Sequence, residues 1–484
     1  MRAMPGITHL ATYFPRRRLD RGLIAKAWGS RAVPGSRTVA AIDEDALTMA
    51  VDTALACVGD GDPARFDGLY FASTSAPYLE KQVASAVATA IDLPRDVSVA
   101  DLAGSTRAGL GAVRVACDAV RAGSLSHPLV VAADVRLAEP GSELESQLGD
   151  GAVCAAVGRD DVIAELVSTA SVAEEFTYLW RTDDQRYLQV ADARFGNQYG
   201  VARDLPEAVG AALRRAELPP ARVAKLCLAV PDPRAAADAA KRIGCDPNTQ
   251  LEPACEAGVL GTPDPLVLLS HALETATPGD FLVVAAYGEG ADALVFRATD
   301  ALVARRPVPV AEGLANGMAV PSYERWLRAR GVLPADVAGE TVPTYIEWKE
   351  LKQDIRLYGS RCKTCGLVQY PQALVCIGCQ GRDCLAEQRL AKRGTVFTFT
   401  IDNLAPVAEH PMPMAVVDLD GGGRVYLQGT DCVDGDIAVG KRVQLTFRRL
   451  HEMGGKRNYF WKVRPACAAS IGAAAEEVRS GLGS

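Results

Sequence analysis

The stretch LVVAAD at residues 129–134 is followed by GDGAVCAAVG at 149–158, and the same order of features returns later in the chain. There LVVAAY at 282–287 runs directly into GEGADALVFRA at 288–298. Continuous apolar runs of this length are typical of strands buried on both faces. A repeated unit of strand, glycine-rich turn and strand predicts a fold built twice from one supersecondary element. The competing interpretation is that any α/β protein contains several such strands, but the repeated order of elements favours duplication.

Other segments of the first three hundred residues extend this pattern. Further apolar runs lie at 69–72 and 226–230, and apolar residues follow helical spacing over 47–58. Alternation of short apolar runs with amphipathic helical stretches is typical of an α/β domain with parallel strands. We therefore predict a duplicated α/β fold over residues 1–302.

The second half of the chain changes in composition. Residues 303–345 are rich in Pro and Arg, and we interpret them as a linker with one short helix at about 323–330. The segments that follow are predicted to be a helix with four closely spaced cysteines at 346–386, a β-rich domain at 387–466 and a flexible tail at 467–484.

Composition excludes several classes of function. The chain has 484 residues, 49% hydrophobic and 23% charged residues, and a formal net charge of −7. This balance excludes bulk disorder and argues against a nucleic-acid binder, whose affinity depends on a basic surface. No run of about 18 apolar residues is present and no signal peptide is expected, so we predict a cytoplasmic protein with no membrane partner. The 13 cysteines do not suggest a disulfide framework, and five histidines limit mechanisms that need an imidazole base.

Four cysteines have the spacing of a metal site. Cys362 and Cys365 form one CxxC motif, and Cys376 and Cys379 form a second one ten residues further on. Two tight turns that present two thiolates each satisfy tetrahedral Zn²⁺. A redox CxxC motif would need only one pair at a helix N-terminus. We therefore predict a structural zinc with no position open to substrate, and we interpret Cys384 as a spare thiol.

The sequence after the cysteines favours a small β-barrel. Alternate residues on one face mark three segments, Thr395 to Phe399, Val443 to Phe447 and Tyr459 to Val463. GGG at 421–423 and GG at 454–455 punctuate the region. Period-two alternation between glycine-rich turns is typical of barrel strands.

Two sets of longer motifs carry family likenesses. The first set is ITHLATYFPRRRLDR (7–21), DEDALTMAVDTAL (43–55), YFASTSAPYLEKQVAS (70–85), DLAGSTRAGLGAV (101–113) and GDGAVCAAVG (149–158). With these stretches the first three hundred residues resemble the 3-hydroxy-3-methylglutaryl-CoA (HMG-CoA) synthase branch of the thiolase superfamily, which implies an α/β thiolase-like duplicated fold over residues 1–302. The second set is LKQDIRLYGSRCKTCGLVQYPQALVCIGC (351–379), GTVFTFT (394–400) and NYFWKVRP (458–465). These stretches resemble the zinc-ribbon (rubredoxin-like) and OB-fold family that accompanies thiolases, which implies a helix plus zinc ribbon at 346–386 and an OB-fold at 387–466.

The first likeness implies where a condensing enzyme would keep its catalytic Cys, Glu and His. The motif positions implied for Cys and Glu hold Thr106 and Thr74, and no His follows the strand at 226–228. A family Asn that polarises the thioester would fall near Glu256. The resemblance therefore implies candidate catalytic positions Thr106, Ser105, Thr74 and Glu256 with altered identities.

Two interpretations of the segment at 105–109 remain open. In one, Ser105 or Thr106 is a nucleophile with Glu256 or Asp232 as its base. In the other, which we favour, this is a small-residue turn in which Ser105 caps the following helix, Arg107 faces solvent and Gly109 packs closely.

Two functions remain in competition. The resemblance implies a component of an acyl-CoA carbon–carbon bond-forming or bond-cleaving complex, with coenzyme A thioester as substrate and a separate thiolase supplying the reactive Cys. The alternative is a self-sufficient acyl-CoA condensing or retro-aldol enzyme with rewired residues, because retro-aldol cleavage needs no covalent acyl intermediate. A homodimer or a heteromer with a thiolase is expected from the likeness. Arg16, Arg17 and Arg18 could meet CoA phosphates, but a charge run is usually a solvated face.

Overall fold

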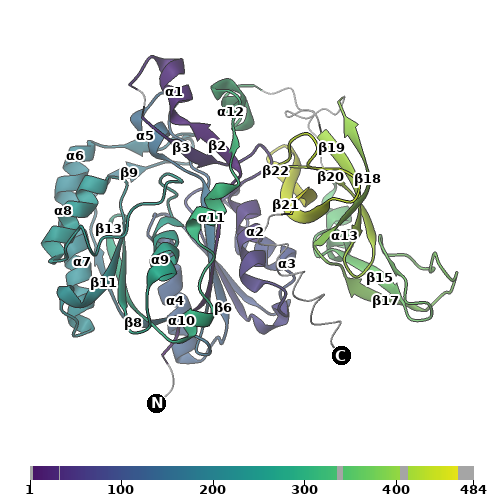
Figure 1. Ribbon diagram of the computed structural model, residues 1–484, viewed down its shortest axis with the longest axis horizontal. Coiled ribbons are helices and arrows are strands. Elements are labelled where there is room, and N and C mark those ends of the chain that lie inside the picture. The colour runs from purple at the N-terminus through teal and green to yellow at the C-terminus, as the bar shows by residue number, and fades with distance from the viewer. Residues whose placement is uncertain (1–3, 32, 335–341, 404–411, 467–484) are drawn as a thin grey trace. The chain divides into compact units, whose positions relative to one another are not determined.

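The chain forms two compact units, Met1–Leu327 and Arg328–Ser484 (Figure 1). The computed structural model describes residues 4–31, 33–334, 342–403 and 412–466. The division between the units falls inside the segment interpreted as a linker, while the predicted boundaries at 302, 345, 386 and 466 stay a prediction. The tail predicted at 467–484 lies outside the described residues. None of the described helices combines the length and apolar character that a membrane crossing requires.

One nine-stranded sheet organises the first unit. Its order is β11 (Val223–Ala229), β12 (Phe281–Tyr287), β13 (Gly290–Ala298), β8 (Ala164–Ala173), β1 (Gly6–Tyr13), β7 (Gly151–Gly158), β6 (Pro128–Asp134), β4 (Gly68–Ala72) and β5 (Ser98–Leu102). The apolar runs recognised in the sequence are therefore strands of this sheet. A three-stranded sheet of β14 (Met318–Ala319), β2 (Arg17–Asp20) and β3 (Ser36–Val39) accompanies it.

The pairing of the strands confirms the internal repeat. Strand β6 pairs parallel to β4 and antiparallel to β7, and β12 pairs parallel to β11 and antiparallel to β13. The prediction of a parallel sheet is corrected, because each repeat ends in an antiparallel pair and the sheet is mixed. Only Gly288 and Glu289 separate β12 from β13, and so short a turn can return the chain only antiparallel to itself.

Helices cover both faces of the sheet (Figure 1). On β12, Leu282, Val284 and Ala286 join the core that contains α4 (Ala108–Ala122) and α9 (Asp264–Thr275). The alternate residues Val283 and Ala285 join the core beneath α7 (Ala202–Arg215) and α8 (Pro233–Ile243). Successive side chains of a strand point to opposite faces of the sheet, so a continuous apolar strand contributes to the two separate cores on those faces. The remaining helices of this part are α1 (Arg21–Trp28), α2 (Ala46–Val58), α3 (Val83–Ala90), α5 (Glu143–Gln147) and α6 (Ala193–Gly196).

The segment after β13 carries more structure than the single helix expected there. It contains α10 (Ala301–Ala304), α11 (Val310–Ala315), β14 and α12 (Tyr323–Ala329). Strand β14 pairs with Arg17 and Arg18 of β2, and the Arg18 Nη2 atom donates to the Leu314 carbonyl at 3.0 Å. Arg18 therefore holds this segment in place, which corrects the view of residues 16–18 as a purely solvated run.

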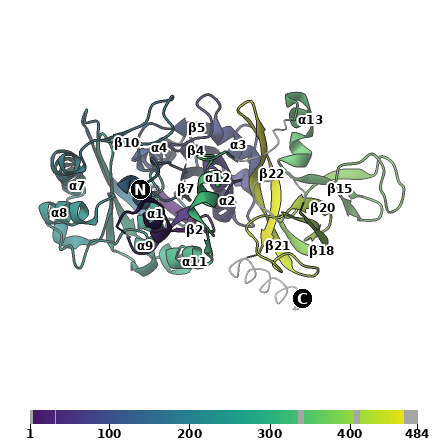
Figure 2. The same cartoon turned by 90° about the horizontal axis from the view of Figure 1, so that it is seen from above.

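The second unit consists of a helix, a small ribbon and a β-barrel (Figure 2). Helix α13 (Thr344–Asp354) precedes the ribbon sheet of β16 (Val368–Gln369), β15 (Tyr358–Cys362) and β17 (Leu385–Arg389). The barrel has the order β20 (Arg424–Gln428), β19 (Met412–Leu419), β18 (Arg393–Asp402), β21 (Arg442–Met453) and β22 (Lys456–Pro465). A parallel bridge between Gly429 and Val463 links its first and last strands, consistent with the predicted OB-fold.

Aromatic and charged side chains fix the barrel interior. Trp461 is fully buried, and its indole N–H donates to the Ile355 carbonyl at 3.0 Å, which ties the barrel to the chain after α13. Arg448 and Asp431 form an ion pair of 2.7 Å in which neither side chain is exposed. Val443, Leu445 and Phe447 are all buried, as their alternation predicted, whereas Phe397 and Phe399 are exposed.

Candidate functional site

A cavity of about 490 Å³ opens in the first unit where both repeats end their parallel strands. Its lining includes residues that follow β4, β5, β6, β11 and β12 at their carboxyl ends. Parallel strands of open α/β sheets deliver ligand-binding residues at this edge. The short hairpin of β9 (Leu179–Trp180) and β10 (Gln189–Val190) contributes Leu179 and Trp180 to the lining.

Three of the four candidate catalytic residues line this cavity. Thr74, Ser105 and Thr106 contribute to its wall, whereas Glu256 is exposed and is not among the lining residues. The Thr106 hydroxyl donates to the Tyr287 carbonyl at 2.9 Å, and the Ser105 hydroxyl donates to the Gly288 carbonyl at 3.3 Å. These bonds join the start of α4 to the turn between β12 and β13. A catalytic role for any of the four residues stays a prediction.

The turn interpretation of residues 105–109 is right in one part and wrong in two. Helix α4 begins at Ala108 after Arg107, without a side-chain cap, so Ser105 does not cap it. Arg107 does not face solvent, because it donates to the Val172 and Glu289 carbonyls and lies 3.5 Å from the Asp292 carboxylate. Gly109 does pack closely, since a Cβ there would lie 2.3 Å from the Thr262 carbonyl oxygen.

A buried carboxylate joins the loops around the cavity. Asp134, at the end of β6, is 0% exposed. One of its oxygens accepts from the Thr74 backbone N–H at 2.8 Å and the Ser75 hydroxyl at 2.7 Å. The other accepts from the Thr262 N–H and hydroxyl at 2.9 and 2.8 Å. Asp134 is the last residue of the LVVAAD stretch at 129–134, and the structure shows it connecting segments 128 residues apart.

A carboxyl group in the cavity wall, Asp264, was missed by the sequence analysis. Asp264 is the first residue of α9, lines the cavity and is partly exposed to it. Burial raises the pKa of its carboxyl to about 6, against the lowering effects of the Leu260 and Gly261 backbone N–H groups and of Arg136. Its position after the TP dipeptide at 262–263 is an ordinary helix start, so no local signal marked it as functional.

Thiol and imidazole groups are absent from the described lining of the cavity. Cys255, the cysteine closest in sequence to an expected site element, packs partly buried against the core, and burial raises the pKa of its thiol to about 12. His271 instead lies 3.2 Å from Glu252 and 3.1 Å from Glu274, and none of these three lines the cavity.

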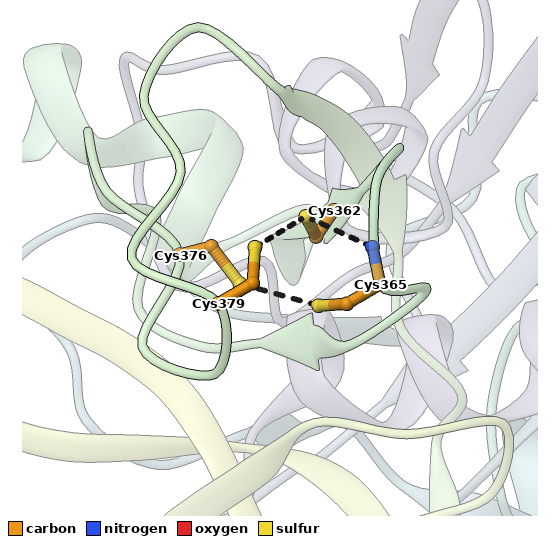
Figure 3. A group of neighbouring side chains, drawn as sticks. All are labelled: Cys362, Cys365, Cys376 and Cys379. Carbon is orange, nitrogen blue, oxygen red and sulfur yellow. Dashed lines mark hydrogen bonds between the residues drawn. The ribbon is translucent and has the colours of Figure 1, made fainter.

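The predicted zinc ligands come together in the second unit. The Sγ atoms of Cys362, Cys365, Cys376 and Cys379 all lie within 4.8 Å of one another, and the side chains converge on one point (Figure 3). Cys362 ends β15, and the two CxxC turns bring the other three thiols to it. The Sγ of Cys384 lies 3.5 Å from that of Cys362, beside this four-sulfur cluster.

Backbone N–H groups favour the thiolate form at two of the four cysteines. The N–H groups of Cys365 and Thr364 lower the pKa of the Cys362 thiol to about 6, and those of Cys379 and Gly378 lower the pKa of Cys376. Four thiolates at tetrahedral spacing fit Zn²⁺, which would hold the two turns together and leave no coordination position for substrate. The zinc ribbon is therefore a structural metal site.

The fold and these sites define the class of the protein. The first unit has the α/β fold of solved HMG-CoA synthase structures, and the second combines a zinc ribbon with an OB-fold. Residues 349–383 match the family described as "ChsH2, rubredoxin-like zinc ribbon domain". Residues 387–448 match the one described as "ChsH2, C-terminal OB-fold domain".

Individual relatives support the same assignment. The chain is 27% identical over 350 residues to a hydroxymethylglutaryl-CoA synthase of Pyrobaculum arsenaticum, covering 68% of this chain and 98% of the relative. A structure of MvaS in complex with 3-hydroxy-3-methylglutaryl coenzyme A superposes with a TM-score of 0.58 at 19% identity, covering 71% of this chain and 95% of that one. An HMG-CoA synthase structure complexed with CoA gives a TM-score of 0.59 at 18% identity, covering 68% and 90% of the two chains.

Proposed function

We propose that this protein is a component of an acyl-CoA carbon–carbon bond-forming or bond-cleaving assembly that acts with a separate thiolase. The observation that carries the proposal is the cavity at the strand ends of the duplicated sheet, whose described lining holds neither a thiol nor an imidazole. An acyl-CoA is its proposed ligand. In support, solved structures of similar fold hold CoA and HMG-CoA.

A separate thiolase accounts for the covalent step. A threonine hydroxyl is much less acidic than a thiol and needs an adjacent base before it can attack a thioester. The Thr106 hydroxyl donates to a backbone carbonyl, and no side-chain base is bonded to it among the described contacts. The acyl-enzyme step therefore belongs to the partner, and this chain binds the acyl-CoA that the partner makes or consumes.

The second unit is the proposed connector. Its ribbon and barrel resemble thiolase-associated domains, which supports a role in docking the partner. The match to the ChsH2 zinc ribbon domain is followed along the chain by the match to the ChsH2 C-terminal OB-fold domain. Strand β5 is an edge of the nine-stranded sheet, and an unpaired edge can extend across a subunit interface. We therefore expect a homodimer or a heteromer with the thiolase.

The test separates the contributions of the two proteins. The full chain alone should bind acetyl-CoA in calorimetry but release no free CoA from a panel of acyl-CoA thioesters. Together with a thiolase that copurifies with it, activity should appear and should be lost when the thiolase cysteine is replaced. Turnover by the lone chain that is abolished by Thr106→Val, and unaffected by Thr89→Val on α3 (Val83–Ala90), would instead establish a self-sufficient acyltransferase.

A second candidate function rests on one specific observation. The partly exposed carboxyl of Asp264 lines the cavity, and an aldol or retro-aldol reaction requires a base but no covalent acyl intermediate. A chain that cleaves 3-hydroxyacyl-CoA by itself would show this chemistry without a thiolase. Cleavage of 3-hydroxybutyryl-CoA by the isolated chain would favour this candidate over the connector role.

A further inference from the structure

Asp264 is held rigidly at the cavity wall. One carboxylate oxygen accepts from the Leu260 backbone N–H at 3.0 Å, and the other accepts from the Gly261 N–H at 3.0 Å. A carboxylate offers about four lone-pair sites, so each oxygen keeps one free after these bonds. The group is therefore oriented by the backbone and still able to accept a proton from a molecule in the cavity.

Arg136 is a second group placed for a ligand. Its side chain is 4% exposed and lines the same cavity. One guanidinium nitrogen, Nη2, donates to the Val259 carbonyl at 3.1 Å, while Nε is buried without a hydrogen-bond partner among the described residues. A buried donor without an acceptor costs free energy, so a ligand oxygen that accepts from it would bind favourably.

The surroundings of Asp264 set its charge. Arg136 favours the ionised carboxyl, and Asp134 disfavours it. The Cys255 thiol, which also interacts electrostatically with Asp264, stays neutral because burial raises its pKa to about 12. Burial is the largest effect and brings the pKa of Asp264 to about 6, where a carboxyl can both accept and return a proton near neutral pH.

We propose that Asp264 is an acid–base group of this cavity and that it exchanges a proton with the acyl part of a bound acyl-CoA, while Arg136 donates to an acyl oxygen. The proposal deepens the second candidate function, the aldol or retro-aldol reaction, and rests on it, since it requires an acyl-CoA in the cavity. It assigns to this chain a proton transfer that needs no covalent acyl intermediate.

The reaction balances without a cofactor. In the cleavage direction, the Asp264 carboxylate takes the proton of the C3 hydroxyl of a 3-hydroxyacyl-CoA. The C2–C3 bond breaks, C3 becomes a carbonyl, and the electron pair passes to C2 as the thioester enolate. Asp264 then returns its proton to C2 and releases the shortened acyl-CoA. In the condensation direction, Asp264 removes the C2 proton of an acyl-CoA first, and that half-reaction can be observed alone.

The experiment follows that half-reaction with acetyl-CoA as the probe. The full chain is incubated with acetyl-CoA in D₂O, and mass spectrometry measures deuterium uptake at C2, while calorimetry measures binding. Asp264→Asn should lower the exchange rate by about 100-fold or more and change the Kd by less than about threefold. Asp20→Asn, which alters a helix-capping carboxylate outside the cavity, is the matched control and should leave the rate unchanged.

The pH dependence of the natural chain gives an independent readout. Because only the ionised carboxylate accepts a proton, the exchange rate should rise between pH 5 and 7 with a midpoint near the pKa of about 6. This measurement stands even if Asp264→Asn fails to fold. A folded Asp264→Asn variant that exchanges within about threefold of the natural chain, or a flat pH profile, overturns the assignment. Acetyl-CoA that does not bind at all would instead overturn the proposed function, and this assignment with it.

Discussion

Exchange of Cys376 for serine should release the zinc and unfold the ribbon around it. The natural chain should carry about one zinc ion, held by the four sulfur atoms that lie within 4.8 Å of one another. Structural zinc contributes about 10–16 kcal/mol of apparent binding free energy in small domains, and that energy is also folding energy. With one thiolate missing, the zinc content measured by mass spectrometry should fall to near zero, and residues 349–383 should become sensitive to protease.

The thiol of Cys384 makes Cys376 a better position for this substitution than Cys362. Cys384 lies 3.5 Å from Cys362, so it could replace that ligand in a Cys362→Ser variant. The loss of zinc that we also predict for Cys362→Ser is therefore best measured together with Cys362→Ser/Cys384→Ser. Cys384→Ser alone is the control and should keep its zinc. A Cys376→Ser chain that retains a full equivalent would show that this cluster does not bind the metal as a four-thiolate site.

The first unit should stay folded when Cys376→Ser removes the zinc and unfolds the ribbon. The two compact units divide at residues 327 and 328, and the first has its own buried cores. Acetyl-CoA binding by the Cys376→Ser chain should therefore stay unchanged, while association with the thiolase weakens. Loss of both together would mean that the two units depend on each other for folding.

Replacement of Asp134 by alanine should strongly destabilise the first unit. Its carboxylate is fully buried and accepts hydrogen bonds from Ser73, Thr74, Ser75 and Thr262. Without it, two backbone N–H groups and several hydroxyls remain buried with no acceptor, each at a cost of about 1–3 kcal/mol. We expect the free energy of unfolding to fall by about 3–5 kcal/mol, measured by urea denaturation.

The same substitution should also remove ligand binding, because the residues bonded to Asp134 belong to loops that line the cavity. Asp160→Ala removes an exposed aspartate from the same unit and should change the free energy of unfolding by no more than about 0.5 kcal/mol. Unfolding of the Asp134→Ala chain within about 1 kcal/mol of the natural one would refute the role of this carboxylate as the connector of the loops.

Much of the fold could be predicted from local sequence. The runs at 129–134 and 282–287 are β6 and β12, and the helix predicted over 47–58 is α2 (Ala46–Val58). The mixed pairing of the sheet could not be predicted in this way. Apolar periodicity reports how a strand is buried, and it does not report the direction of the neighbouring strand.

Only part of the candidate site could be predicted from the sequence, for a similar reason. Thr74, Ser105 and Thr106 were found through family motifs, and all three line the cavity. Asp264 and Arg136 were missed as a pair because they lie far apart in the chain and each has an ordinary local context. The buried Nε of Arg136 and the raised pKa of Asp264 arise only from packing.

The sequence by itself determined the zinc cluster, because two CxxC turns separated by ten residues bring four thiols together by local geometry alone. It also determined the duplicated α/β architecture, since each repeat carries its own pattern of strand and turn. Only the tertiary structure decided which side chains share the cavity. Strands that are distant in sequence end at one edge of the sheet, and their loops together form the cavity. The pKa of Asp264, the burial of Arg136 and the hydrogen bonds of Asp134 all depend on this meeting of distant segments.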